Sequence, residues 1–478
     1  MGRTRFQRAA GAIVAMVVVC TAVAAWGASP SETLQKAIYT EETVGNVDEA
    51  IKLYQQVIDE AKSAKSAAAQ AEYRLAQCLF KKDRKTEANA ALEKLIADYP
   101  EEKELVAKAR RLLPTALKLQ AAPWQDHEAL MLDIKLVTGL DIGAYVYMID
   151  SDKHEGKDIW RCSTRAFVAV NGAQSYSYVL AEKESFAPIK SRWMHSLLGD
   201  VEATYLPDVV KLHDLLKNTT REVKLDGPIF DNEQVSEMFR RLPLAVGYKT
   251  TIPVMATLGS GKFPLGLEVT GKETVEVPAG KFECFKIVLN IGQTFYISTD
   301  EHRYAVKFAA GGVTGELSQI YHLEPGRPLT FETKDFSLTL PERWFAFTPQ
   351  PLKKDKEEGT AIMDVDGAAT ASAVAKPIKP EDKSKSLRQR AEAEIELQKK
   401  ALKDFKVREG GIEERKVAGL PAVSLLADFR DDDKKMVMYA VTVQGEKTDV
   451  TFSVSIAADR FEAYRKDFDK MVESVKLK

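Results

Sequence analysis

A serine, an aspartate and a histidine stand close together in one short hydrophilic stretch, at Ser298, Asp300 and His302. These are the residue types of a hydrolytic triad, in which histidine takes the proton of a nucleophilic serine and the acid orients the histidine. A working triad also needs an oxyanion hole, and its members usually come from distant segments. Here all three share one loop, and the chain has no G-x-S-x-G nucleophile elbow. The stretch is therefore predicted to turn a hairpin corner.

The sequence does not indicate a metal site or a cofactor site either. The six histidines form no H-x-x-x-H or H-E-x-x-H spacing, and no C-x-x-C pair occurs. The acidic run Asp431–Asp433 lacks the distal glutamate of a calcium loop, so a solvated hairpin tip is expected there. No catalytic residue, metal or cofactor is predicted, and the chain is predicted not to be an enzyme. A hydrolase with residues from distant segments stays open as a third hypothesis.

Three cysteines lie beyond the N-terminal segment, at Cys78, Cys162 and Cys284. An odd number leaves at least one thiol free in an exported protein. Cys162 and Cys284 both lie in strand-like runs of one predicted domain, so a disulfide between them is one alternative. The other alternative is that all three are small buried hydrophobic residues.

The first 28 residues have the layout of a secretory signal peptide. Arg3, Arg5 and Arg8 form a positive region, and an apolar run and small residues follow. The apolar run is shorter than the roughly 20 residues that a membrane span needs. The signal segment is either cleaved or retained as an anchor, and both alternatives stay open. Export is predicted in either case. After cleavage, no stable membrane span is predicted.

Length and composition describe soluble globular material. The chain has 478 residues, which is too many for one ordinary core, and it is 45% hydrophobic and 29% charged. The formal net charge is -2, so no basic excess indicates a nucleic-acid partner. Two to four domains are expected.

Residues 31–120 are predicted to form helical hairpins. The segments Asn46–Glu60 and Arg84–Asp98 align residue for residue, so that Ala50 falls on Ala88. In both segments large residues follow the alanine four and eight positions later. A small residue lets two helices approach closely, and the large residues then fill the space beyond the crossing.

This pattern resembles the tetratricopeptide repeat, which ends with a proline such as Pro100, although Ala76 replaces the usual glycine. The resemblance implies a protein partner held in a concave groove lined by the first helix of each hairpin. A helical spacer or a dimerisation arm is the alternative. The groove candidates by helix position are Tyr39, Glu42, Tyr73 and Gln77.

Residues 125–323 are predicted to form an antiparallel β domain with one internal helix. Short apolar or alternating runs separated by polar turns favour antiparallel meanders. The helix follows Asp231, which is placed to cap its start. The apolar stripe of this helix is the candidate lining of a cleft between helix and sheet, and it consists of Val235, Met238, Phe239 and Leu242.

About residues 130–320 resemble exported bacterial proteins of unknown function, through an R-x-L-P-L motif at Arg240 and a V-P-A-G-x-F motif at Val277–Phe282. The resemblance implies a strongly curved antiparallel sheet, or incomplete barrel, around a helix. That fold is similar to the lipoprotein carriers of the periplasm, whose concave face holds acyl chains. The resemblance transfers no catalytic residue, but it implies a lipid or apolar ligand as an alternative partner.

Residues 329–478 are predicted to form an α+β sandwich, in which helices at Lys385–Phe405 and at the C-terminal end pack on one side of a sheet. The stretch Phe336–Trp344, the G-L-P-A turn at Gly419 and the closing F-x-x-M-V-E-S resemble the PsbP and DcrB-like superfamily. That resemblance implies an accessory or binding domain rather than an enzyme.

The predicted fold class is thus multidomain α plus β: helical-hairpin repeats, a curved antiparallel sheet around a helix, and an α+β sandwich. The first functional hypothesis is a non-catalytic adaptor in the periplasm or cell envelope of a bacterium, with a protein partner on the repeats. The alternative is a periplasmic carrier of a lipid or apolar ligand in the concave face of the central domain.

Overall fold

A computed structural model of the protein describes residues 29–60, 64–112, 117–169, 171–225, 227–259, 261–349, 359–367, 369–382 and 384–478. The predicted signal segment lies outside these residues. The chain divides into two compact units, Met1–Ala116 and Leu117–Lys478.

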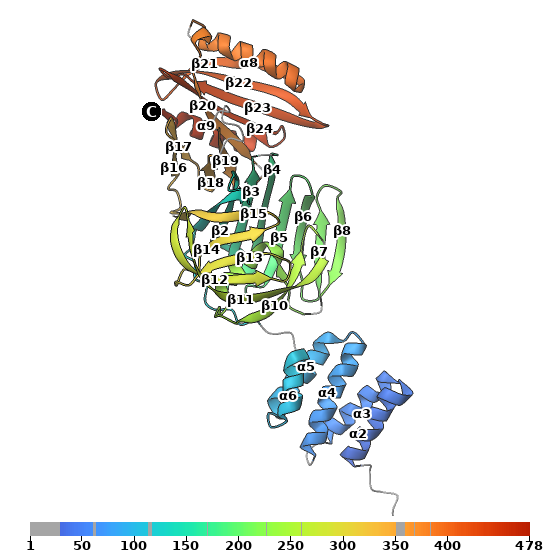
Figure 1. Cartoon of the computed structure of the whole chain (residues 1–478). Helices are drawn as coiled ribbons and strands as arrows, with labels where there is room; N and C mark the ends of the chain where they lie inside the picture. The colour runs from blue at the N-terminus through green and yellow to red at the C-terminus, as the bar shows by residue number, and fades with distance from the viewer. Residues whose placement is uncertain are drawn as a thin grey trace, which may run out of the picture. The chain divides into compact units, whose positions relative to one another are not determined.

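The described part of the first unit is helical (Figure 1). Its elements are α2 (Pro30–Tyr39), the π turn η1 (Thr40–Val44), α3 (Val47–Asp59), α4 (Lys65–Lys81), α5 (Lys85–Asp98) and α6 (Lys103–Leu112). Consecutive α-helices pack against each other, from α2 to α6. The first begins with a capping box, because the Ser29 hydroxyl accepts from the amide of Glu32, whose carboxylate accepts from the amide of Ser29.

Small residues lie where the helices of the first unit cross. Ala50 on α3 and Ala88 on α5 are fully buried, and so are Tyr54 and Leu92 four residues later. The two aligned segments therefore have the same burial, and the predicted helical hairpins are confirmed.

The largest sheet of the second unit has 15 strands, in the order β8-β7-β6-β5-β4-β3-β2-β1-β15-β14-β13-β12-β11-β10-β9. Neighbours are antiparallel except β9 and β10. The bounds are β1 (Glu128–Leu136), β2 (Asp141–His154), β3 (Lys157–Val168), β4 (Ala173–Glu182), β5 (Pro188–His195), β6 (Gly199–Tyr205), β7 (Val209–Asp214), β8 (Thr219–Lys224), β9 (Phe230–Asp231), β10 (Lys249–Ala256), β11 (Gly261–Val277), β12 (Gly280–Leu289), β13 (Thr294–Ser298), β14 (Ala305–Ala310) and β15 (Val313–His322).

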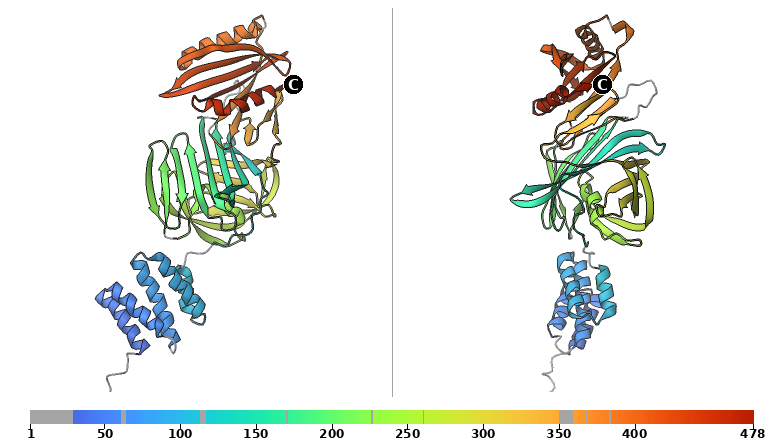
Figure 2. Two further views of the ribbon diagram at one scale, coloured as in Figure 1. Left: turned by 180° about the vertical axis from the view of Figure 1, so that it is seen from behind. Right: turned by 90° about the vertical axis from the view of Figure 1, so that its left-hand side faces the viewer.

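This sheet curls into an incomplete barrel. Its order has two ends, β8 and β9, so the sheet is not closed. However, β9 contacts β5 from the other half of the sheet, and apolar side chains of β6 and β7 pack against β10. Figures 1 and 2 show the curvature from three sides. The predicted curved antiparallel sheet is confirmed.

A short helical segment, η3 (Asn232–Gln234) followed by α7 (Val235–Arg241), packs on the inner face of this curve. Asp231 caps its start as predicted, since its carboxylate accepts from the amide of Glu233. All seven residues of α7 are buried, including Arg240, whose guanidinium lies 2.6 Å from the carboxylate of Glu128 on β1.

The rest of the second unit has two further sheets, ordered β16-β17-β25 and β18-β19-β20-β24-β23-β22-β21. The elements are β16 (Leu329–Glu332), β17 (Phe336–Leu340), β18 (Trp344–Phe347), β19 (Gly359–Asp364), β20 (Thr370–Pro377), η4 (Pro380–Asp382), α8 (Leu387–Ala401), β21 (Lys403–Val417), β22 (Leu420–Asp431), β23 (Lys434–Val443), β24 (Thr448–Ala457), α9 (Phe461–Glu473) and β25 (Lys476–Leu477).

Helices α8 and α9 were expected on one side of the sheet, but they pack on opposite faces of the seven-stranded sheet (Figure 1), and α8 is shorter than expected. Met438 and Ala440 of β23 lie beside α8, whereas the alternate residues Val437, Tyr439 and Val441 share a core with α9.

α8 ends at Ala401 because Leu402 is extended, and Phe405 lies in β21 instead of on the helix. α9 packs on the main core through Phe468 and Met471, whereas α8 contacts β21 and β22.

Candidate functional site

The first helices of the hairpins lie side by side, since α2 contacts α4 and α4 contacts α6. Tyr39, at the end of α2, is 59% exposed, and Glu42 on η1 is exposed. Tyr73 and Gln77 lie four residues apart on α4 and are half-buried. Residues four apart share one face of a helix. The candidate groove residues therefore lie on α2, η1 and α4, and α2 and α4 contact each other.

One ion pair brings two of these elements together. A guanidinium nitrogen of Arg74 on α4 lies 2.6 Å from a carboxylate oxygen of Glu42. Gln70, which the sequence reasoning did not name, is exposed three residues before Tyr73 on the same helix face. Its helical spacing from Tyr73 was the signal that could have identified it.

A buried carboxylate holds the helices beneath this face. Glu41 accepts from the hydroxyl of Tyr54 at 2.7 Å, from Lys81 at 2.7 Å and from Arg74 at 3.3 Å. Burial alone would raise the pKa of Glu41, but the bonds from Lys81 and Tyr54 lower it below its ordinary value. Glu41 thus stays ionised and ties η1 to α3 and α4.

The predicted cleft beside α7 is filled by the stripe that was expected to line it. Met238, Phe239 and Leu242 are each 0% exposed and belong to the core of the incomplete barrel. Phe239 packs edge-on against Phe295 of β13, with ring centroids 5.2 Å apart. Apolar side chains on a helix inside a curved sheet gain most by contacting it directly. Val235, from the same stripe, lines a cavity at the start of α7.

That cavity has a volume of about 210 Å³ and lies at the start of α7. Ile291, in the turn between β12 and β13, lines it and is 48% exposed, so the cavity reaches the surface there. The lining residues are mostly apolar or aromatic: Tyr145, Tyr147, Asn232, Glu233, Val235, Ser236, Leu265, Leu289, Ile291, Gln293, Phe295, Phe308 and Ala310. The sequence reasoning missed this site because the lining comes from strands far apart in the chain.

Four aromatic rings form one wall of the cavity. The rings of Tyr145 and Tyr147 on β2 have centroids 4.6 Å apart. Phe308 on β14 is 6.2 Å from Tyr145 and 5.9 Å from Phe295. Phe308 reaches across β15 because Gly315 has no side chain there: a Cβ atom would lie 2.1 Å from the ring.

The acidic residue in the cavity lining is Glu233. Its carboxylate accepts from the hydroxyl of Ser177 on β4 at 2.8 Å and from the amide of Asn232 at 2.9 Å. Burial, and next the nearby carboxylate of Asp231, raise the pKa of Glu233 to about 7. A carboxylic acid with a pKa near neutrality, in an apolar cavity, marks a candidate binding site.

Asp231 fixes the segment that carries Glu233. One oxygen of its buried carboxylate accepts from the hydroxyls of Tyr205 on β6 at 2.6 Å and of Thr257, just after β10, at 2.7 Å. Ser191 on β5 donates to the same oxygen. Asp231 thus joins the two halves of the incomplete barrel beside the cavity.

The cluster at Ser298 turns a corner, as predicted. One oxygen of Asp300 accepts from the Ser298 hydroxyl at 2.9 Å and from the backbone amides of His302 and Arg303. The His302 ring stacks on Tyr304 instead of contacting the serine. All side-chain bonding at Asp300 therefore stabilises the turn.

The disulfide alternative is not what the structure has. Cys78, Cys162 and Cys284 are buried free thiols, which is the other alternative. Burial raises the pKa of Cys162 well above its usual value and that of Cys284 to about 12. Both thiols pack in the core of the incomplete barrel as small apolar groups.

The described residues hold no group of three or more His, Cys, Asp or Glu side chains arranged for a metal ion. In the same described part, no helix is both long and apolar enough to cross a membrane.

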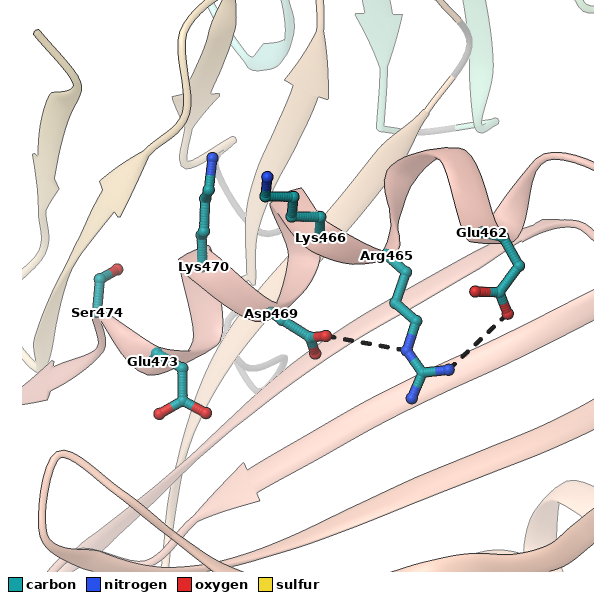
Figure 3. A pocket seen from close by; sticks show the side chains of 7 residues that line it. All are labelled: Glu462, Arg465, Lys466, Asp469, Lys470, Glu473 and Ser474. Atoms are coloured by element: carbon teal, nitrogen blue, oxygen red, sulfur yellow. Dashed lines mark ion pairs between the residues drawn. The ribbon is translucent and has the colours of Figure 1, made fainter. Parts of the chain in front are cut away.

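A shallow hollow runs along the outer face of α9 (Figure 3). Its lining comes from that one helix, and Arg465 lies 3.8 Å from Glu462 and 3.9 Å from Asp469. Intrahelical pairs between exposed charges are typical of a solvated helix face. No second element contributes to this hollow, so it makes a poor binding site.

Two family matches cover parts of the chain. Residues 70–102 match the tetratricopeptide repeat, and residues 132–317 match the family described as "Protein of unknown function (DUF3108)". The latter match covers the region that resembled a family of unknown function. No curated protein matches the chain.

Solved structures are similar to parts of the chain. The cyanobacterial PsbP (CyanoP) from Synechocystis sp. PCC 6803 is 13% identical, with 33% of this chain and 98% of that chain covered and a TM-score of 0.26. The β-barrel-like DUF1849 protein from Brucella abortus is 12% identical, with 41% and 97% covered and a TM-score of 0.27. LpqN of Mycobacterium tuberculosis, involved in cell envelope biogenesis, is 18% identical, with 33% and 87% covered and a TM-score of 0.20. Likeness at this level carries no argument about function.

Proposed function

We propose that the protein is a non-catalytic adaptor of the cell envelope whose helical repeats hold a protein partner. The observation that carries the proposal is the exposed face of α2 and α4, with Tyr39, Gln70 and Tyr73 on helices that contact each other. The tetratricopeptide match over α4 and α5 supports the same role. Export is proposed from the N-terminal layout of arginines, apolar run and small residues.

An exposed tyrosine is well suited to a binding face. It offers a large apolar ring and a hydroxyl, and little side-chain entropy is lost when it is ordered. Ion pairs such as Glu42–Arg74 hold the surrounding helices in place, so the face is preformed. A helical or extended peptide that presents apolar side chains is the partner this face fits.

Deletion of residues 29–112 tests the proposal. The full chain and the deleted chain, each with its N-terminal segment, are crosslinked in intact cells, and the partners are recovered and identified. The proposal predicts partners that the full chain recovers and the deleted chain does not. Identical partner sets from both chains would overturn it.

The cavity of about 210 Å³ favours a second candidate function, the binding and carriage of a ligand by the incomplete barrel. Clefts for drug-sized ligands usually measure about 300–1,000 Å³, so this cavity suits a small ligand or the end of a larger one. Native and denaturing mass spectrometry of the protein from its own cells tests this function. Extra mass in the native spectrum alone supports carriage, and a bare polypeptide in both spectra contradicts it.

A further inference from the structure

The lining of the cavity at the start of α7 combines aromatic rings with a carboxylic acid. Four of its thirteen residues are aromatic, one is the carboxylic acid Glu233, and none of these lining residues is basic. An aromatic ring attracts a cation over its face, and the attraction grows when the cation is removed from water. A carboxylate beside such rings adds a direct charge interaction. The lining therefore favours a positively charged ligand over an anionic one.

Within the part of the chain that the structure describes, no lysine, arginine or histidine forms an ion pair with Glu233. Its hydrogen-bond partners are the neutral Ser177 and Asn232, and the carboxylates of Asp231 and Glu237 add negative charge nearby. Arg240 is engaged elsewhere: it pairs with Glu128 and donates to the backbone oxygens of the loop before β14. A cation in the cavity would supply the missing countercharge.

The cavity's size limits the ligand. A volume of about 210 Å³ holds about seven non-hydrogen atoms, if each takes roughly the 30 Å³ of a water molecule. A strongly hydrated ammonium without alkyl groups would lose its water shell without filling the apolar wall. An ammonium with several alkyl groups is weakly hydrated and matches both the rings and the acid.

We propose that this cavity binds a small alkylated ammonium ion, held between Glu233 and the rings of Tyr145, Tyr147, Phe295 and Phe308. The proposal rests on the second candidate function, ligand binding in the incomplete barrel, and names the class of ligand. The cation is either a free small molecule or the headgroup of a larger amphiphile whose remainder leaves the cavity beside Ile291.

The test compares two probes of the same shape and different charge. Choline and its neutral isostere 3,3-dimethylbutan-1-ol are titrated into the full chain by calorimetry at pH 8, above the pKa of Glu233. The proposal predicts that choline binds roughly tenfold more tightly than the alcohol. Phosphatidylcholine vesicles, tested alongside, distinguish a headgroup from a free ion.

Two variants and one control complete the design. Glu233→Gln keeps the shape and the acceptor for Ser177, and it is expected to remove the preference for choline. Phe308→Leu keeps the carboxylate of Glu233 and is expected to weaken the binding of choline more than the binding of the alcohol. Glu276→Gln, at an exposed site on β11, is expected to change neither the affinity for choline nor the affinity for the alcohol.

Equal affinity for choline and the alcohol would overturn the cation proposal and leave ligand binding in place. Absence of saturable binding for both probes would overturn the cation proposal and contradict ligand binding. A choline preference that persists in Glu233→Gln would also overturn it, because the charge would then come from elsewhere.

Discussion

At the scale of single residues, the buried acid Glu41 and the half-buried acid Glu233 differ in the groups that compensate their charge. Glu41 in the helical unit receives bonds from Lys81, Arg74 and Tyr54, and its pKa is lowered despite burial. Glu233 in the barrel receives only neutral donors, and its pKa is raised to about 7. The first acid therefore stabilises the fold, whereas the second costs stability when ionised.

Glu41→Gln is expected to destabilise the helical unit by about 1–3 kcal/mol, because it leaves Lys81 and Arg74 without their shared countercharge. Amide hydrogen exchange of α3 and α4 in the full chain measures the loss. Glu49→Gln, whose exposed acid pairs only with Lys52, is the control and should leave exchange nearly unchanged. Equal protection in Glu41→Gln and the parent would contradict the account.

Glu233→Gln is expected to stabilise the second unit at pH 8 by about 1–3 kcal/mol and to have little effect at pH 5. The folded pKa is about 7 and the ordinary value is 4.5, so the folded state retains a proton that the unfolded chain releases. Stability therefore falls as pH rises through this window, and glutamine removes that loss. Thermal unfolding at both pH values measures the difference; a loss of stability at pH 8 would refute the assignment.

At the scale of elements, the sequence predicted the features that one local segment determines. It did not predict the features that several distant segments form together. The cap at Asp231 and the equal burial of Ala50 and Ala88 follow from spacing along one segment. The apolar stripe of α7 was identified correctly, but a stripe cannot show whether a helix faces a cleft or a filled core. The cavity rings come from three strands, β2, β13 and β14, and no local pattern joins them.

Gly315→Ala is expected to displace the Phe308 ring and cost about 1–3 kcal/mol, because a methyl group would overlap the ring. Chemical denaturation of the full chain measures the cost. Gly271→Ala, at a strand glycine where a Cβ meets nothing within 4 Å, is the matched control. Adding Phe308→Leu to Gly315→Ala should recover part of the loss; if it does not, the overlap is not the cause.

At the scale of the whole molecule, the second unit is one packed body built from two β regions. Met131 and Met148 of the large sheet share a core with Phe345 and Met363 of the seven-stranded sheet. Arg165 on β3 is fully buried and donates to the backbone oxygen of Asp364 and the hydroxyl of Thr370. The sequence predicted two separate domains, residues 125–323 and 329–478, and no local pattern in it indicated this interface.

Arg343→Ala is expected to uncouple the two β regions. Arg343 donates to Asp150 on β2 and to Asp366 after β19. Its removal leaves each acid with one other partner, His127 and Arg161 respectively, at a cost of about 1–3 kcal/mol. Calorimetry should show the unfolding of the second unit split into two transitions. Arg221→Ala, an exposed site on β8, should keep the parent profile. An unchanged profile in Arg343→Ala would show that the apolar core alone holds the joint.

We propose that the exposed face of α2 and α4, with Tyr39, Gln70 and Tyr73, binds a protein partner. The most direct measurement is quantitative crosslinking in intact cells with the full chain carrying Tyr39→Ala and Tyr73→Ala. A matched control carries Lys52→Ala and Glu93→Ala on α3 and α5. Partner recovery is expected to fall at least about tenfold with the tyrosine variant, since two aromatic anchors contribute a few kcal/mol. The control variant is expected to recover the partner as the parent does. Equal recovery by both variants, each folded, would contradict the account.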